Sequence, residues 1–381
     1  MSQTKNEATF NTHAYKVHKL EDFPAAEAVV TREEALRYYT QMKTARTMEG
    51  EIDKLYREKR ARGFCHEYSG QEACATGIVA VKDENDAVIT SYRCHPWAYL
   101  MGSSVPQILC ELTGHIQGVV HGKGGSMHMF DPHFYGGNGI VGAQESLGVG
   151  IAMAFKYREE QNVSFTLFGD GAANQGQLYE VANMAELWKL PVVFVCENNG
   201  YAMFTSVEHH SSTRQFYNRF SFLPGLWVDG MDLISVREAM RFARQHALSG
   251  KGPIFVELAT YRYMGHTASD PGIRYRPLHE VDEVRRAKDP ISHFREKILG
   301  SNLVTPEELT KIDEEIVAEI AKAGKISREY DPLPKEALYA DVYKNTEPQL
   351  VRGATIDESV KQPCLYTKDI LEKIGHVKLE S

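Results

Sequence analysis

The chain has 381 residues, of which 43% are hydrophobic and 25% are charged, and its formal net charge is −8. This composition is typical of a globular protein with a large core, and no long basic segment suggests binding to nucleic acid or to a membrane surface. No apolar run approaches the ~20 residues that span a bilayer. Six scattered cysteines without CxxC spacing indicate reduced thiols. We therefore expect small molecules and protein chains as ligands and partners.

The N-terminal residues lack the apolar core of a secretory signal and do not resemble an Arg-rich transit peptide. Thr31 and Glu34 form a capping-box pattern, and apolar residues then recur at helical spacing as far as Leu55. This pattern predicts a long amphipathic helix that ends near Arg60. Segments rich in glycine and histidine follow it, separated by short apolar runs.

Charged residues alternate with alanine and isoleucine over 295–325, which predicts surface helices. The chain shows no internal repeat and no low-complexity segment. The organisation that we expect is an extended N-terminal arm over residues 1–30, an α/β domain over 31–340 and an irregular C-terminal tail over 341–381.

The middle of the chain predicts a β-α-β unit. Residues 163–168 and 191–196 are apolar and short enough to be buried strands, and a helical pattern lies between them. A right-handed crossover makes the two strands parallel, so both end at the same edge of the sheet. The predicted buried face of the helix comprises Leu178, Val181, Met184, Leu187 and Trp188.

Polar residues follow both strands. Asp170 comes after the first strand and Asn199 after the second. If the strands are neighbours, about 4.8 Å apart, the two side-chain oxygens can bind one small hard cation. A helix that begins just after Gly171 would direct backbone N–H groups to the same place. The pattern therefore predicts a site for a metal-bound diphosphate at this edge.

Two further apolar runs are expected to end at the same edge. Residues 87–91 precede Tyr92 and Arg93, and residues 254–260 precede a glycine-bordered loop that carries His266. An arginine and a histidine beside a diphosphate would supply charge-assisted hydrogen bonds.

A competing nucleotide-binding pattern is present at Gly137–Gly142, which formally matches GxGxxG. Its context does not fit, because the preceding DPHFY is not a buried strand. The acids about 20 residues later, Glu159 and Glu160, lie at a helix end instead of a strand end. We therefore do not expect a dinucleotide cofactor here.

The combination of GDG, 26 intervening residues and NN resembles the thiamine-diphosphate motif. Segments from about Ala8 to Asp357 resemble alpha subunits of the thiamine-diphosphate-dependent 2-oxo acid dehydrogenases. The pyruvate type is closer than the branched-chain type. The segments that carry this resemblance are GFCHEYSGQEA, HGKGGSMHM, FYGGNGIVGAQ, GDGAANQGQ, ENNGYAM and YRYMGHTASDPG.

The resemblance implies an α/β thiamine-diphosphate-binding fold, in which a mainly parallel sheet carries helices on both faces. It implies that Mg²⁺ is held by Asp170, Asn199 and the carbonyl of Tyr201. His266 and His66 are expected in active-site roles. The residues expected to bind thiamine diphosphate are Tyr92, Arg93, Gly139, Val141, Asp170, Gly171, Ala172, Asn199, Tyr201, Met203 and His266.

The activity implied is oxidative decarboxylation of pyruvate in the mitochondrial matrix, with transfer of the acetyl group to the lipoyl arm of dihydrolipoamide acetyltransferase. No glutamate of this chain could be given the role of activating the cofactor. In the family that glutamate comes from a beta subunit, so the resemblance implies two alpha and two beta chains with the cofactor between them.

Four positions depart from the family's usual residues, namely Pro96, Glu145, Ala202 and Phe204. They leave two alternatives open: a branched-chain 2-oxo acid dehydrogenase subunit, or a catalytically weak structural or regulatory paralogue.

Eukaryotic alpha subunits of this family are inactivated by phosphorylation in loops at the mouth of the active site. At the matching positions this chain has Thr267, Arg274 and Ser206. Since Arg274 cannot be phosphorylated, we expect Thr267 as the main site and Ser206 as a minor one, with Ser269 a bystander. A pyruvate dehydrogenase kinase and phosphatase would then be partners.

Overall fold

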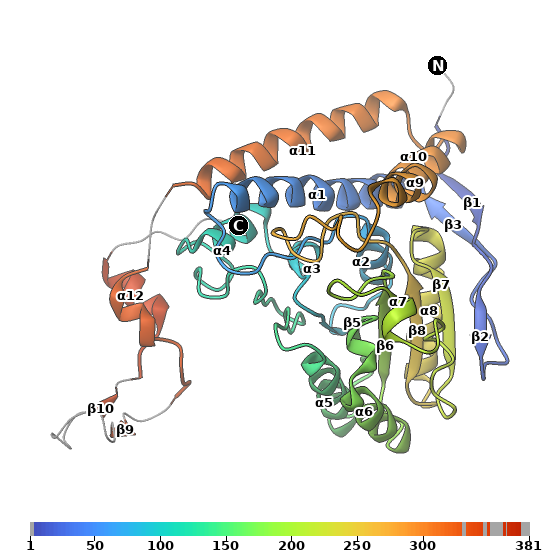
Figure 1. Ribbon diagram of the computed structural model, residues 1–381, viewed down its shortest axis with the longest axis horizontal. Helices are drawn as coiled ribbons and strands as arrows, with labels where there is room; N and C mark the ends of the chain where they lie inside the picture. The colour runs from blue at the N-terminus through green and yellow to red at the C-terminus, as the bar shows by residue number, and fades with distance from the viewer. Residues whose placement is uncertain (1–3, 330–332, 346–348, 351–360, 363, 375–381) are drawn as a thin grey trace.

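The computed structural model describes residues 4–329, 333–345, 349–350, 361–362 and 364–374. Its centre is a six-stranded sheet in the order β2-β7-β8-β6-β5-β4 (Figure 1). Only β2 runs antiparallel to its neighbour, so the expectation of a mainly parallel sheet is confirmed. The strands are β2 (Lys16–His18), β4 (Ala87–Ile89), β5 (Ser164–Gly169), β6 (Val192–Asn198), β7 (Gly225–Asp229) and β8 (Ile254–Ala259).

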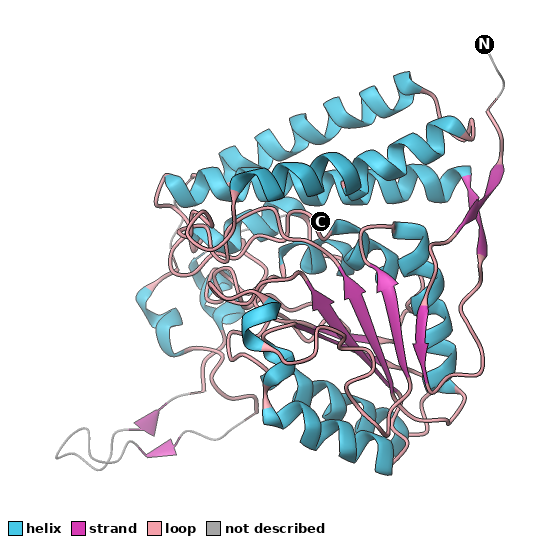
Figure 2. Cartoon of the chain, turned by 45° about the vertical axis from the view of Figure 1, so that its right-hand side comes forward, coloured by secondary structure: helices cyan, strands magenta, loops and turns pink. Residues whose placement is uncertain are grey.

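Helices cover both faces of the sheet, as expected (Figure 2). Successive strand side chains point to opposite faces, so Phe165 and Leu167 join one core while Phe168 joins the other. Helices on the first face are α1 (Arg32–Arg57), α2 (Glu72–Val79), α3 (His95–Met101), α4 (Val105–Thr113), α8 (Leu233–Leu248) and α11 (Pro306–Ile326); those on the second are α5 (Ala143–Tyr157) and α6 (Gly176–Leu187).

The long first helix forms as predicted. The Thr31 side chain accepts a hydrogen bond from the Glu34 backbone N–H, and the Glu34 carboxylate accepts one from Thr31 N–H. Its buried stripe includes Met42, Met48 and Ile52. The expected surface helices over 295–325 correspond to α10 (Pro290–Gly300) and α11, and α9 (Leu278–Lys288) precedes them.

The N-terminal residues are packed against the domain. β1 (Glu7–Asn11) and β3 (Glu27–Thr31) form an antiparallel hairpin, while β2 extends the central sheet beside β7. Much of the expected tail, 341–381, lies outside the described residues; the described part includes α12 (Thr367–Ile374) and the two-residue strands β9 (Gln349–Leu350) and β10 (Lys361–Gln362). The boundaries of arm, domain and tail stay predictions.

Two details of the β-α-β prediction are wrong. Residues Ala172–Asn174 form a short 3₁₀ turn, and extended Gln175 separates it from α6, so no α-helix begins directly after Gly171. The predicted helical face is also shifted. Leu187 and Trp188 are 71% and 40% exposed, because α6 packs on the sheet through Leu178, Val181, Ala182 and Ala185.

Candidate active site

The carboxyl ends of β4, β5, β6 and β8 open on one cavity of about 980 Å³. Gly169 at the end of β5 pairs with Glu197 of β6, so Asp170 and Asn199 leave adjacent strands at nearly the same level. Both are nearly fully buried. The sequence-based expectation that the two strands are neighbours and parallel is confirmed.

The cavity wall brings together all the residues predicted to bind cofactor or to act in catalysis. They come from six separate parts of the chain and meet only in the fold. The wall includes His66, Tyr92, Arg93, Gly139, Val141, Asp170, Gly171, Ala172, Asn199, Tyr201, Met203 and His266. Thr267 also lies in the wall, whereas Ser206 does not.

The amide of Asn199 has a fixed orientation. Its Nδ2 donates to Gln71 Oε1 at 3.0 Å, which leaves Oδ1 as the acceptor for Tyr201 N–H at 3.3 Å. An Oδ1 held in this way is the atom that a hard cation would require. Asp170 Oδ2 lies 3.0 Å from His210 Nε2, on α7 (Val207–His210).

Glycine at position 171 has a packing reason. A Cβ built there would lie 2.8 Å from the Cβ of Ala202. Since real Cβ atoms avoid such a separation, the loops that follow β5 and β6 can approach this closely only if residue 171 is glycine.

Arg93 joins two loops of the site. Its Nη1 donates to Glu67 O at 2.8 Å and its Nη2 to His266 O at 2.7 Å. Burial lowers the pKa of Arg93 to about 10, so the guanidinium stays charged at neutral pH. It therefore holds the backbone of His266 and that of Glu67, the residue that follows His66.

His66, Tyr92 and His266 form an aromatic cluster. The ring centroids of His66 and Tyr92 are 4.2 Å apart, and those of His66 and His266 are 5.4 Å apart. Burial, followed by the charge of Arg93, lowers the pKa of His66 to about 2 and that of His266 to about 3. Both imidazoles are neutral at pH 7 and can each donate and accept one hydrogen bond.

The glycine segment before α5 forms another part of the wall. No strand precedes it; the only pairing there within the described residues is isolated bridges at Phe134. Since α5 ends at Tyr157, Glu159 and Glu160 follow a helix. The dinucleotide interpretation therefore fails in the structure, as it does in the sequence.

Gln144 is a wall residue that the sequence did not reveal. It lies in the first turn of α5, is fully buried, and neither of its amide atoms has a hydrogen-bond partner among the described residues. An unpaired buried amide costs free energy unless a ligand satisfies it. Its presence fits a cavity built for a polar ligand.

Three more polar residues were missed: Gln71 and His210, which contact the two metal-site side chains, and Glu197. Glu197 lies in the wall, its carboxylate contacts the Tyr68 hydroxyl, and burial raises its pKa to about 7. The sequence could have indicated Glu197 as a site residue, because it lies at the carboxyl end of the strand that Asn199 follows. Gln71 lies in the loop before α2 and His210 on α7, and local spacing does not bring either residue to the strand ends.

The unusual residues take different positions. Phe204 lies in the wall in the left-handed region, at φ 61°, with its ring centroid 5.6 Å from that of Tyr275. Pro96 is buried in the first turn of α3 and does not line the cavity. Glu145 is buried behind the wall, in the core-facing stripe of α5.

The loop that carries His266 is held by Asp270. Its Oδ2 accepts from His266 N–H at 2.7 Å and its Oδ1 from Gly272 N–H at 2.9 Å. The hydroxyl oxygens of Thr267 and Ser269 are 2.9 Å apart. Ser206 begins α7, and its hydroxyl lies 3.0 Å from His209 Nδ1.

The described part of the chain contains no cluster of three or more His, Cys, Asp or Glu side chains arranged to hold a metal. A cation at Asp170 and Asn199 would therefore need oxygen ligands from a bound anion, which is how Mg²⁺ commonly binds together with phosphates. The donor set thus fits a metal-diphosphate pair better than a metal alone. No described helix is long and apolar enough to cross a bilayer.

The fold and this site define a member of a known enzyme class. A family model described as Dehydrogenase E1 component matches residues 40–336, and the chain belongs to this family. A Caenorhabditis elegans protein described as probable pyruvate dehydrogenase E1 component subunit alpha, mitochondrial, is 55% identical over 369 residues, covering 97% of this chain and 93% of that protein. The human pyruvate dehydrogenase E1 component subunit alpha, somatic form, mitochondrial, is 51% identical over 349 residues, covering 92% and 90%.

Proposed function

We propose that the chain is the alpha subunit of a mitochondrial pyruvate dehydrogenase, an oxidoreductase that decarboxylates pyruvate and transfers the acetyl group to a lipoyl arm. The single observation that carries this proposal is the convergence of Asp170, Asn199, Arg93 and His266 on one cavity of a Dehydrogenase E1 chain. The names of the relatives favour pyruvate over a branched-chain substrate.

Thiamine diphosphate and Mg²⁺ are the cofactors of this family, and the cavity contains suitable partners for both. We assign the metal to Asp170, Asn199 Oδ1 and the carbonyl of Tyr201. Tyr92, Arg93 and His266 would bind the diphosphate, and Gly171, Ala172 and Met203 would line it. Gly139 and Val141, with the unpaired amide of Gln144, would face the aminopyrimidine.

When bound, thiamine diphosphate supplies the carbanion that attacks the ketone and the ring that accepts the electrons released on decarboxylation. The chain's own residues orient the groups that contact the substrate. Arg93 holds the backbone of His266 and that of Glu67, the residue that follows His66. Because His66 and His266 are neutral, each can donate to a substrate carboxylate or ketone oxygen without adding a buried charge.

The carboxylate that activates the cofactor is assigned to a beta subunit. Glu197 is the one glutamate among the residues of the cavity wall, and its carboxylate is engaged by Tyr68. We propose that this chain works in a complex with a beta subunit, as two alpha and two beta chains, and passes acetyl groups to a dihydrolipoamide acetyltransferase core.

Thr267 is proposed as an inhibitory phosphorylation site and Ser206 as a minor one. A phosphate adds about −1.5 to −2 charges, and Thr267 adjoins His266 in the wall of the cavity. Repulsion of the cofactor diphosphate would follow. Ser206 lies outside the wall, so its phosphorylation should have less effect.

The test is pyruvate decarboxylation by the purified chain with and without a co-expressed beta subunit, both with thiamine diphosphate and Mg²⁺. We expect activity only in the complex. Competition against 2-oxobutanoate and a branched 2-oxo acid gives the ratio of specificity constants, which should favour pyruvate. Robust activity of the chain alone would refute the two-subunit mechanism and would make Glu197 the candidate for the activating carboxylate.

A further inference from the structure

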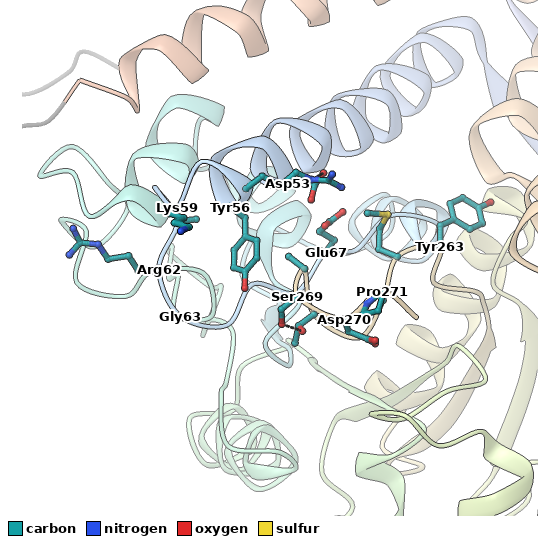
Figure 3. A pocket seen from close by; sticks show the side chains of 16 residues that line it. Asp53, Tyr56, Lys59, Arg62, Gly63, Glu67, Tyr263, Ser269, Asp270 and Pro271 are labelled. Atoms are coloured by element: carbon teal, nitrogen blue, oxygen red, sulfur yellow. Dashed lines mark hydrogen bonds and ion pairs between the residues drawn. The ribbon is translucent and has the colours of Figure 1, made fainter. Parts of the chain in front are cut away.

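A second cavity, of about 840 Å³, lies behind the loop that carries His266. Its walls are the end of α1, the segment 59–63 and the loop 263–271 (Figure 3). Thr267, Ser269, Asp270 and Pro271 line this cavity and the candidate active site alike. One loop is therefore the partition between the two cavities.

Glu67 marks the interior of the second cavity. Figure 3 shows it between Asp53 of α1 and the loop residues Asp270 and Pro271. Glu67 is 2% exposed, and its Oε1 has no hydrogen-bond partner among the described residues. A buried polar atom without a partner is uncommon and costly, so this oxygen points to a ligand.

The charges around Glu67 favour a cationic group at that point. Burial, with the nearby carboxylates of Glu49 and Asp53, raises the pKa of Glu67 to about 8, against the weaker opposing effect of Arg93 and Arg57. The side chain is therefore mostly protonated at pH 7 when the cavity holds no cation. An ammonium group beside it would favour the carboxylate and release the proton.

Positively charged side chains lie nearer the solvent side of the same cavity. Arg57 is 73% exposed at its side chain and pairs with Asp53 at 2.8 Å. Lys59 and Arg62 make no ion pair within the part of the chain that the structure describes. A ligand that carried only positive charge would be repelled here, whereas an anionic group would be attracted.

Apolar side chains complete the walls, including Ala61, Met264, Ala268 and Pro271. From this arrangement we propose that the second cavity binds a small zwitterionic amine, an apolar α-amino acid, with its ammonium group at Glu67 and its carboxylate toward Arg57.

The binding itself does not depend on the proposed function. Calorimetric titration of the assembled complex with L-leucine, in two buffers of different ionisation enthalpy, measures affinity and protons released. We expect saturable binding, with and without saturating thiamine diphosphate, and release of close to ~1 proton per chain at pH 7. N-acetyl-L-leucine, which lacks the ammonium group, should release none, and L-leucinamide, which lacks the carboxylate, should bind more weakly.

Variants separate the two ends of the site. Glu67→Gln should raise the dissociation constant of L-leucine at least about tenfold and abolish proton release, while exposed Glu84→Gln should change neither. Replacing Arg57 by methionine should weaken binding but leave the protons released per bound ligand unchanged. Absence of binding, competition by thiamine diphosphate for the same site, or unaltered proton release by Glu67→Gln would overturn the proposal.

Discussion

Glu145 should destabilise the folded chain, and by an amount that grows with pH. It lies in the first turn of α5, is fully buried, and neither carboxylate oxygen has a hydrogen-bond partner among the described residues. Burial raises its pKa to about 8 from an ordinary value of 4.5. The folded state therefore holds this proton more tightly than the unfolded state, and stability falls as pH rises from 4.5 to 8.

The size of the effect follows from the shift. Each pH unit between the two pKa values costs about 1.4 kcal/mol, so keeping Glu145 protonated in the folded state costs roughly 3 kcal/mol at pH 7 and less than about 1 kcal/mol at pH 5. Glu145→Gln removes the titration with little change in size, and Glu145→Met also removes the buried polar atoms. Both variants should be more stable than the wild type at neutral pH.

The assay is thermal denaturation of the assembled complex at a series of pH values between 5 and 8. The melting temperatures of both variants should exceed that of the wild type by a margin that widens with pH. Exposed Glu180→Gln, on α6, serves as the matched control and should show no such trend. A margin independent of pH, or a wild type more stable than Glu145→Gln at pH 8, would refute the reasoning, because it would require a partner for the carboxylate.

Two further predictions concern the cavity and its loop. In the folded state the pKa values of His66 and His266 lie far below 6.5, so the stability that they contribute is present above pH 6.5 and falls below it, by about 2 kcal/mol each at pH 5. The melting temperatures of His66→Gln and His266→Gln should therefore fall less between pH 6.5 and pH 5 than that of the wild type. An equal fall in all three proteins would contradict this. Incubation with a pyruvate dehydrogenase kinase and ATP should inactivate the wild type and a Ser269→Ala control but spare Thr267→Ala. Equal inactivation of all three would contradict it.

The sequence predicted the site well where local pattern determines position. Parallel strands bring their carboxyl ends to one edge, so residues that directly follow β5 and β6 had to be neighbours once those strands were recognised. Asp170 and Asn199 illustrate this, and Arg93 follows β4 by the same logic. The resemblance then added Gly139 and Val141, which no spacing rule connects to the sheet.

Features that depend on distant contacts were not predictable. Helix α6 begins at Gly176 instead of directly after Gly171, because Gln175 is extended. The amphipathic pattern does not predict this extended residue. Leu187 was assigned to the core by its chemistry, but the sheet meets α6 along a different stripe. Gln144 and Glu67 look like ordinary polar residues in the sequence. Only their burial without partners distinguishes them.

Calorimetric titration of thiamine diphosphate with Mg²⁺ into the complex of this chain and a beta subunit tests the central claim most directly. Asp170→Ala should abolish measurable binding, because it removes the only carboxylate among the proposed metal ligands, while the melting temperature of the cofactor-free complex should change little. Exposed Asp282→Ala, on α9, should bind as the wild type does. Wild-type affinity in Asp170→Ala would contradict the account.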